Sequence, residues 1–248
     1  VFLCLAGFAA ATVDAIAGGG GLISLPAFMA AGVPPHFALG TNKFSSSFGA
    51  VTSAYTFIRS GKVHIPLMKF TVPCTLAGSV IGVFTALRID QKFLRLIILV
   101  LIFATAIYTI AKKDFGSEDK FKGLTSRNII QGCLFAFSLG FYDGFFGPGT
   151  GSFLIFLFIK VYGFDFTTAA GNSKVLNFVS NFTSLVMFAI NGKIYYMLGI
   201  PIGIAMIAGA RMGSKIAIKN GAKVIKPIFV TIALALTLKL LFDAVRLL

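Results

Sequence analysis

The chain has 248 residues, of which 57% are hydrophobic and 12% charged, and its mean hydropathy is +0.91. An ordinary soluble domain has about a quarter of its residues charged, so this composition excludes that class and indicates a multi-pass membrane protein. The formal net charge is +14, but the basic residues lie mostly at the ends of apolar runs, where they orient a protein in the lipid bilayer, so nucleic acid is not an expected partner.

Apolar runs in the first half of the chain predict five helical pieces, since a helix needs about 20 residues to cross the hydrocarbon core. The pieces cover residues 2–17, 20–31, 36–60, 66–88 and 91–112. The first run has no basic stretch before it and no cleavage motif after it, so we expect a retained helix rather than a signal peptide. The second is too short to span. We interpret these two as a hairpin of broken helices meeting at glycines 18–21, and irregular backbone at membrane depth implies a cavity.

A hydrophilic linker at residues 113–126 separates two predicted membrane repeats, 1–112 and 127–248. The second repeat predicts pieces at 128–146, 149–161, 166–190, 196–218 and 222–246. Because each repeat makes an odd number of passes, whether its hairpin crosses or only dips in, the second repeat must enter from the opposite side. The predicted fold class is all-α, with two inverted-topology repeats that each hold a broken or re-entrant helix pair and three transmembrane helices. This organisation is typical of secondary transporters.

The two repeats match at a constant offset of 131 residues from Gly40 onward. In each repeat a glycine-rich turn also follows an aspartate, with residues 18–21 after Asp14 and residues 147–151 after Asp143. Such self-similarity indicates two copies of one ancestral unit. The matched pairs include Gly40 with Gly171, Lys43 with Lys174, Gly61 with Gly192, Gly78 with Gly209 and Gly82 with Gly213. The last two form small-xxx-small pairs, which favour close helix packing.

Two matched lysines, Lys43 and Lys174, lie inside apolar helices. A lysine at a helix centre costs about 2.5–3.5 kcal/mol on insertion scales, so it normally faces a cavity or a partner. The alternative is that each lies near its helix start and snorkels to the interface. Polar neighbours argue for the cavity, because donors clustered around a positive charge suit an oxyanion. These neighbours are Asn42, Ser45, Ser46 and Ser47 in one repeat and Asn172, Ser173 and Asn177 in the other.

The glycine turns predict further contacts to an anion. Backbone N–H groups at a helix start can approach a ligand where no side chain intervenes, and the helix dipole adds positive charge. The turns lack the ending of a Walker loop and the strand of a dinucleotide site, so they do not predict a nucleotide. The candidate substrate-binding residues are Gly19, Gly20, Gly21, Asn42, Lys43, Gly149, Thr150, Gly151, Asn172, Ser173 and Lys174.

Asp14 and Asp143 are the acids that lie deep inside apolar segments. Each caps the following turn or pairs with a buried lysine, or one of them binds the proton or cation that drives transport. Arg211 is a further candidate, either snorkelling toward the end of its helix or serving as an anion ligand in one repeat only. Three scattered cysteines and two histidines at helix ends lack the spacing of a metal site, so we expect no metal and no cofactor.

The paired glycine turns, with Pro26 after the first, and the paired motifs ending in Lys43 and Lys174 resemble the sulfite exporter (TauE/SafE-like) family of membrane permeases. The resemblance covers essentially the whole chain. It implies a multi-pass protein of the cell inner membrane that moves a sulfur-containing or organic anion, such as sulfite or a sulfonate. Pro148 and Thr150 depart mildly from the family's glycine pattern.

The predicted function is therefore a secondary active transporter, an exporter of a small anion by alternating access with possible proton coupling. An anion channel and a permease for a non-sulfur carboxylate are the alternatives. An enzyme is not expected, because the chain offers no pair of nucleophile and base and no metal cluster. The expected partners are the small anion and the lipid bilayer, with a homodimer as an open possibility.

Overall fold

The computed structural model describes the chain except for residues 95–96, 99, 101–117 and 221–248. Within the described part every regular element is helical. Of the predicted piece 91–112, residues 91–94, 97, 98 and 100 are described and helical, and the predicted piece 222–246 lies outside the described residues. The all-helical prediction therefore holds for the described part of the chain.

Helices of the first half begin and end at residues that favour those positions. They are α1 (Phe2–Ala17), α2 (Gly21–Ala30), α3 (Pro35–Arg59) and α4 (Ile65–Arg88). α1 ends because Gly18 adopts left-handed φ and ψ of 80° and 22°. α3 begins with Pro35, whose missing N–H costs nothing at a first helical position. The His64 side chain caps α4 by accepting a hydrogen bond from the backbone N–H of Leu67.

Helices of the second half follow the same order. They are α6 (Ser126–Phe145), α7 (Thr150–Leu157) with its π-helical extension η1 (Phe158–Tyr162), α8 (Phe166–Ile190) and α9 (Tyr196–Asn220). A capping box of Thr125 and Asn128 starts α6, and the Asp165 carboxylate accepts from the N–H groups of Thr167 and Thr168 to start α8. The short second pieces thus appear in both halves, as α2 and as α7 with η1.

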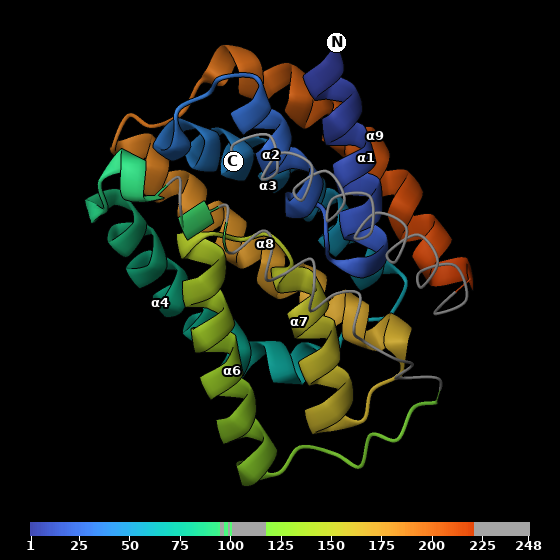
Figure 1. Cartoon of the computed structure of the whole chain (residues 1–248). Coiled ribbons are helices and arrows are strands. Elements are labelled where there is room, and N and C mark those ends of the chain that lie inside the picture. Colours follow the sequence, from blue (N-terminus) through green and yellow to red (C-terminus); the bar gives the residue numbers. More distant parts are fainter. Residues whose placement is uncertain (95–96, 99, 101–117, 221–248) are drawn as a thin grey trace.

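The helices pack across the two halves of the sequence. α1 packs against α9 and α4 packs against α6, while α3 and α8 contact each other between these two outer pairs. Figure 1 shows α4 and α6 on one side of the molecule, α1 and α9 on the other, and α8 between them. Each outer pair therefore joins one helix from each half.

The small-xxx-small glycines allow this packing, as predicted. A Cβ atom at Gly78 would lie 2.1 Å from the carbonyl oxygen of Phe137. In the other outer pair, a Cβ atom at Gly209 would lie 2.2 Å from the carbonyl oxygen of Phe8. Only glycine leaves room for backbones this close, so both helix pairs depend on it.

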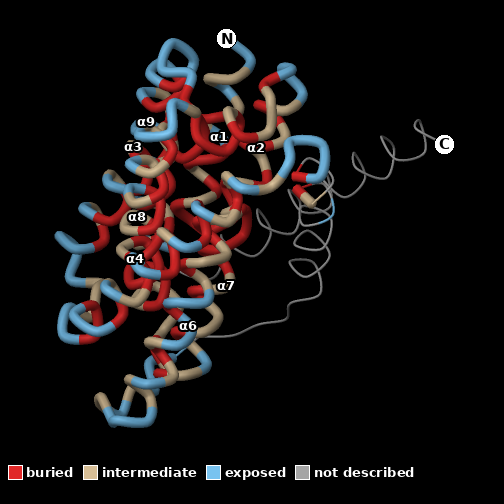
Figure 2. The backbone as a smooth tube through the Cα atoms, turned by 90° about the vertical axis from the view of Figure 1, so that its left-hand side faces the viewer, coloured by how far each residue is buried: buried red, intermediate tan, exposed pale blue. Residues whose placement is uncertain are grey.

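The outer surface of the described part fits a lipid environment. α4, α8 and α9 are each long and apolar enough to cross a membrane. Large apolar side chains such as Phe70, Leu76, Ile81 and Phe84 of α4 are exposed, as expected for a surface that faces lipid. The buried residues form the inner parts of the helices (Figure 2) and include polar and charged side chains.

Candidate functional site

Two buried ion pairs connect the halves at matched positions. Lys43 Nζ of α3 lies 2.9 Å from Asp143 Oδ2 of α6, and these side chains are 3% and 2% exposed. Lys174 Nζ of α8 lies 2.9 Å from Asp14 Oδ2 of α1, with side-chain exposures of 0% and 23%. Each lysine thus pairs with the aspartate of the other half. The snorkelling alternative is wrong for both lysines, because both are buried and each ammonium group contacts a carboxylate of the other half.

The two pairs differ in their additional hydrogen bonds. The Ser180 hydroxyl donates to Asp143 Oδ2 beside the Lys43 contact. Lys174 Nζ donates a second hydrogen bond to the backbone oxygen of Asp14, and the N–H of Gly20 lies 3.4 Å from Asp14 Oδ1. Removing two charges from water costs free energy, and the attraction within an ion pair offsets that cost only when the remaining donors and acceptors are also satisfied. These additional hydrogen bonds help to satisfy them.

The glycine turns that follow the two aspartates contact each other. The Ser152 N–H donates to the Gly18 carbonyl oxygen at 3.3 Å, and the Ser152 hydroxyl donates to the Ala17 carbonyl oxygen at 2.6 Å. A Cβ atom at Gly18 would lie 2.2 Å from the carbonyl carbon of Gly151. The turns therefore bring the starts of α2 and α7 together inside the protein.

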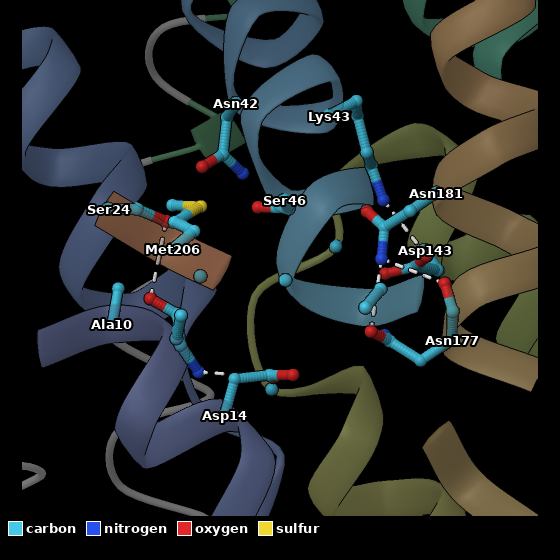
Figure 3. A pocket seen from close by; sticks show the side chains of 17 residues that line it. Ala10, Asp14, Ser24, Asn42, Lys43, Ser46, Asp143, Asn177, Asn181 and Met206 are labelled. Carbon is cyan, nitrogen blue, oxygen red and sulfur yellow. Dashed lines mark hydrogen bonds and ion pairs between the residues drawn. The ribbon is translucent and has the colours of Figure 1, made fainter. Parts of the chain in front are cut away.

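A small cavity lies beside these turns, with about 40 Å³ open to water-sized spheres. One water needs roughly 10–15 Å³ on this measure, so the space suits a few waters or one compact ion. Its charged lining residues are Asp14, Lys43 and Asp143. Figure 3 shows Lys43, Asp143, Asn177 and Asn181 gathered on one side and Ala10, Ser24, Asn42 and Met206 on the other. Gly20, Gly21, Gly147 and Gly149 of the turns also line the cavity.

The structure places the predicted site residues in two groups. Gly20, Gly21, Asn42, Lys43 and Gly149 line the cavity together with both aspartates. The other candidates are not among its lining residues in this conformation: Gly19, Thr150, Gly151, Asn172, Ser173 and Lys174. Ser173 instead donates a hydrogen bond to the Gly151 carbonyl oxygen at 3.0 Å. Arg211 is exposed on α9 and does not line the cavity.

Asn172 holds the start of a neighbouring helix. Its Oδ1 accepts a hydrogen bond of 2.8 Å from the backbone N–H of His64. At the matched position, Thr41 Oγ1 accepts one of 2.9 Å from the N–H of Tyr195. Asn172 therefore makes a structural contact with the other half, as Thr41 does at the matched position.

We expect Asn172→Ala to lower the free energy of unfolding by about 1 kcal/mol, the typical net contribution of one hydrogen bond. Thermal unfolding in detergent measures this loss. Thr41→Ala removes the matched hydrogen bond and is expected to give a loss of similar size. An unchanged unfolding temperature for both variants would contradict the structural assignment.

Sequence reasoning missed three polar residues near the cavity. Asn181 and Ser24 line it, and Ser180 contacts Asp143. Asn181 lies four residues after Asn177 on α8 and donates to its Oδ1 at 3.0 Å. Helical periodicity places residues 174, 177 and 181 on one face, and this signal was present in the sequence. Within the described residues, no group of three or more His, Cys, Asp or Glu side chains could hold a metal ion.

Apolar helices of membrane-spanning length around a charged, polar cavity are typical of an integral membrane protein. The chain belongs to the TauE/SafE sulfite exporter family, whose sequence model matches residues 3–240. The resemblance noted from the motifs is thereby confirmed.

Named relatives agree with this family. The chain is 36% identical to a "Probable membrane transporter protein" of Haemophilus influenzae, over 98% of this chain and 94% of that protein. It is 36% identical to YfcA of Escherichia coli K12, with 97% and 87% covered, and 37% identical to ORF9 of a Sinorhizobium species, with 98% and 92% covered. Both carry the same transporter description, so the names describe transporters rather than enzymes. No solved structure matches the chain.

Proposed function

We propose that the protein is a secondary active transporter that exports a small sulfur-containing or organic anion, such as sulfite or a sulfonate, across the inner membrane. The observation that carries this proposal is Lys43, a buried ammonium group that lines the cavity at the glycine turns. The family description names sulfite export, and the relatives are described as membrane transporters.

The cavity offers an anion several positive partners. Lys43 supplies a positive charge when its ammonium group turns from Asp143 to the anion. Gly21 opens α2 and Gly149 precedes α7, so the N-terminal ends of two short helices line the same space. The helix dipoles favour negative charge at these ends, an arrangement used in transporters with broken helices. Asn42 also lines the cavity, and the Nδ2 group of its amide can donate hydrogen bonds to an anion.

The proposed mechanism is alternating access in a protein built from two inverted repeats, residues 1–112 and 127–248 around the linker 113–126. The matched glycines Gly40 of α3 and Gly171 of α8 make the same close contact with the other half. A Cβ atom at Gly40 would lie 2.2 Å from the carbonyl oxygen of Lys193, and one at Gly171 would lie 1.9 Å from that of Lys62. Since α1 packs on α9 and α4 packs on α6, the moving bodies in this proposal are the outer helix pairs, which rock around α3 and α8. Protonation of Asp14 or Asp143 couples the movement to a proton gradient.

The test is thermal unfolding of the purified protein with sulfite, sulfate, methanesulfonate and small carboxylates. A ligand at a hundredfold excess over its Kd stabilises the native state by about 2.7 kcal/mol. We expect one of the sulfur anions to stabilise the wild type, and Lys43→Ala to weaken its binding at least tenfold. Lys69→Ala is the matched control, because Lys69 is an exposed lysine outside the cavity.

The double variant Lys43→Ala with Asp143→Asn removes the charge of both partners. A loss of binding in this variant would therefore not be caused by an unpaired Asp143 carboxylate. If these variants respond to the anion like wild type, the proposed site is wrong. Stabilisation by carboxylates alone would favour the carboxylate permease. Counterflow in proteoliposomes separates the last alternative, because a carrier shows trans-stimulation and a channel does not.

A further inference from the structure

The two ion pairs are not equivalent, and their difference assigns the coupling acid of the proposed transporter. We propose that Asp143 binds one proton together with each substrate anion, as Lys43 exchanges its ion pair with Asp143 for an ion pair with the substrate. This inference rests on the proposed function and names the residue and the stoichiometry of its coupling.

Charge balance in the cavity requires such an exchange. Lys43 and Asp143 are both nearly buried and together carry no net charge. Asp14, the third charged group of the lining, is neutralised by Lys174. A monovalent anion that entered alone would leave one uncompensated negative charge, which costs several kcal/mol in a buried site. Entry of an anion with a proton on a carboxylate keeps the site neutral.

Accessibility of the lysines favours Asp143 over Asp14 as that carboxylate. Lys43 lines the cavity, so its ammonium group can turn from Asp143 to an anion there. Lys174 is 0% exposed, is not among the lining residues and donates to both the carboxylate and the backbone oxygen of Asp14. Protonation of Asp14 would leave the charge of Lys174 out of reach of the substrate.

The Ser180 hydroxyl gives Asp143 a partner in both protonation states. In the structure it donates to Asp143 Oδ2, and the Asn177 carbonyl oxygen lies 3.1 Å away as a second acceptor. A hydroxyl both donates and accepts, so it can turn its hydrogen to Asn177 and accept the proton of a neutral Asp143. Gly49 occupies the position of the other repeat that matches Ser180, so Asp14 lacks this partner.

Few other titratable groups face the cavity in the described part of the chain. From α3 there is Lys43 and from α1 there is Asp14, with Lys174 of α8 behind it. Tyr142, next to Asp143 on α6, donates its hydroxyl to the Pro148 carbonyl oxygen. α4, α7 and η1, which also pack on α6, contribute no titratable side chain to the lining. A proton bound with the anion therefore has two candidate carboxylates, and the contacts above favour Asp143.

Methanesulfonate is the probe, because it stays a monovalent anion at neutral pH and releases no proton of its own. Calorimetry in two buffers of different ionisation enthalpy measures proton uptake by the detergent-purified protein. We expect the protein to take up about one proton per bound anion. Because binding then consumes a proton, the Kd for methanesulfonate is expected to rise about tenfold for each pH unit wherever the free site holds no proton. In Asp143→Asn we expect binding without proton uptake and a Kd that is flat with pH.

Two further variants complete the test. Asp165→Asn is the control, since Asp165 is an acid at the start of α8 and asparagine also caps helices. Asp14→Asn combined with Lys174→Met removes the Asp14 carboxylate together with the charge of its partner, so that no unpaired charge remains. Proton uptake that is lost in this double variant but kept in Asp143→Asn would overturn the assignment, and so would binding to wild type without uptake. No methanesulfonate binding to wild type would instead count against the proposed anion site itself.

Discussion

Lys174→Ala is expected to lower the free energy of unfolding by about 3 kcal/mol, at the low end of the range for breaking a buried ion pair. Lys174 Nζ donates hydrogen bonds to the carboxylate and to the backbone oxygen of Asp14, and the variant leaves both acceptors without this donor. Asp14 is 23% exposed on its side chain, and partial hydration of its carboxylate keeps the loss from being larger. Unfolding in mixed micelles with increasing denaturing detergent measures this change.

Neutralising both partners is the control for this prediction. Lys174→Met with Asp14→Asn leaves no unpaired charge, and we expect it to recover most of the lost stability. The cross-half pairing predicts a large coupling energy between Lys174 and Asp14 in this double-mutant cycle, and no comparable coupling between Lys174 and Asp143. Lys174→Met alone keeps most of the aliphatic packing and removes the charge, so a single variant as stable as wild type would argue that the lysine acts through its packing rather than its charge.

The repeat pattern pointed to the charged residues of the site but not to their pairing. Lys43 and Lys174 match each other, as do Asp14 and Asp143, so the sequence allows pairing within a half or across the halves. The ion pairs join α3 to α6 and α8 to α1, and side-chain contacts this far apart in the chain cannot be derived from local sequence. Structure was needed to show that each lysine crosses to the other half.

On α8 the sequence indicated Asn177 as a polar neighbour of Lys174 but not Asn181, and both line the cavity. Sequence reasoning chose Asn172 and Ser173, which stand next to Lys174 in the chain, as substrate ligands. Successive residues of a helix point to different faces, whereas residues three or four apart share one. Asn177 and Asn181 follow that spacing and line the cavity, while Asn172 and Ser173 contact backbone elsewhere.

The glycine turns combine two uses that the sequence could not separate. They were predicted to expose backbone to an anion, and Gly20, Gly21 and Gly149 do line the cavity. Gly18 and Gly151 instead let one turn pack on the other. Both uses need a residue without a side chain, so composition alone gives the same pattern. The distances between turns distinguish them.

Gly18→Ala is expected to lower the free energy of unfolding by roughly 2–5 kcal/mol, because two costs add. Gly18 has a φ of 80°, where an L-residue with a Cβ atom costs about 1–2 kcal/mol. Its Cβ atom would also lie 2.2 Å and 2.4 Å from backbone atoms of Gly151 and Ser152, and overpacking of this kind costs about 1–3 kcal/mol.

Gly32→Ala isolates the first of these costs. Gly32 has nearly the same φ, 79°, but a Cβ atom there meets nothing within 4 Å. The difference in unfolding temperature between the two variants therefore reports the contact between the glycine turns alone. If both alanine variants unfolded at the same temperature, the turns would not touch as described, and the starts of α2 and α7 would not share one cavity. A larger loss in Gly18→Ala, together with weaker methanesulfonate binding, would connect the turn contact to the anion site, because both turns contribute lining residues, Gly21 and Gly149.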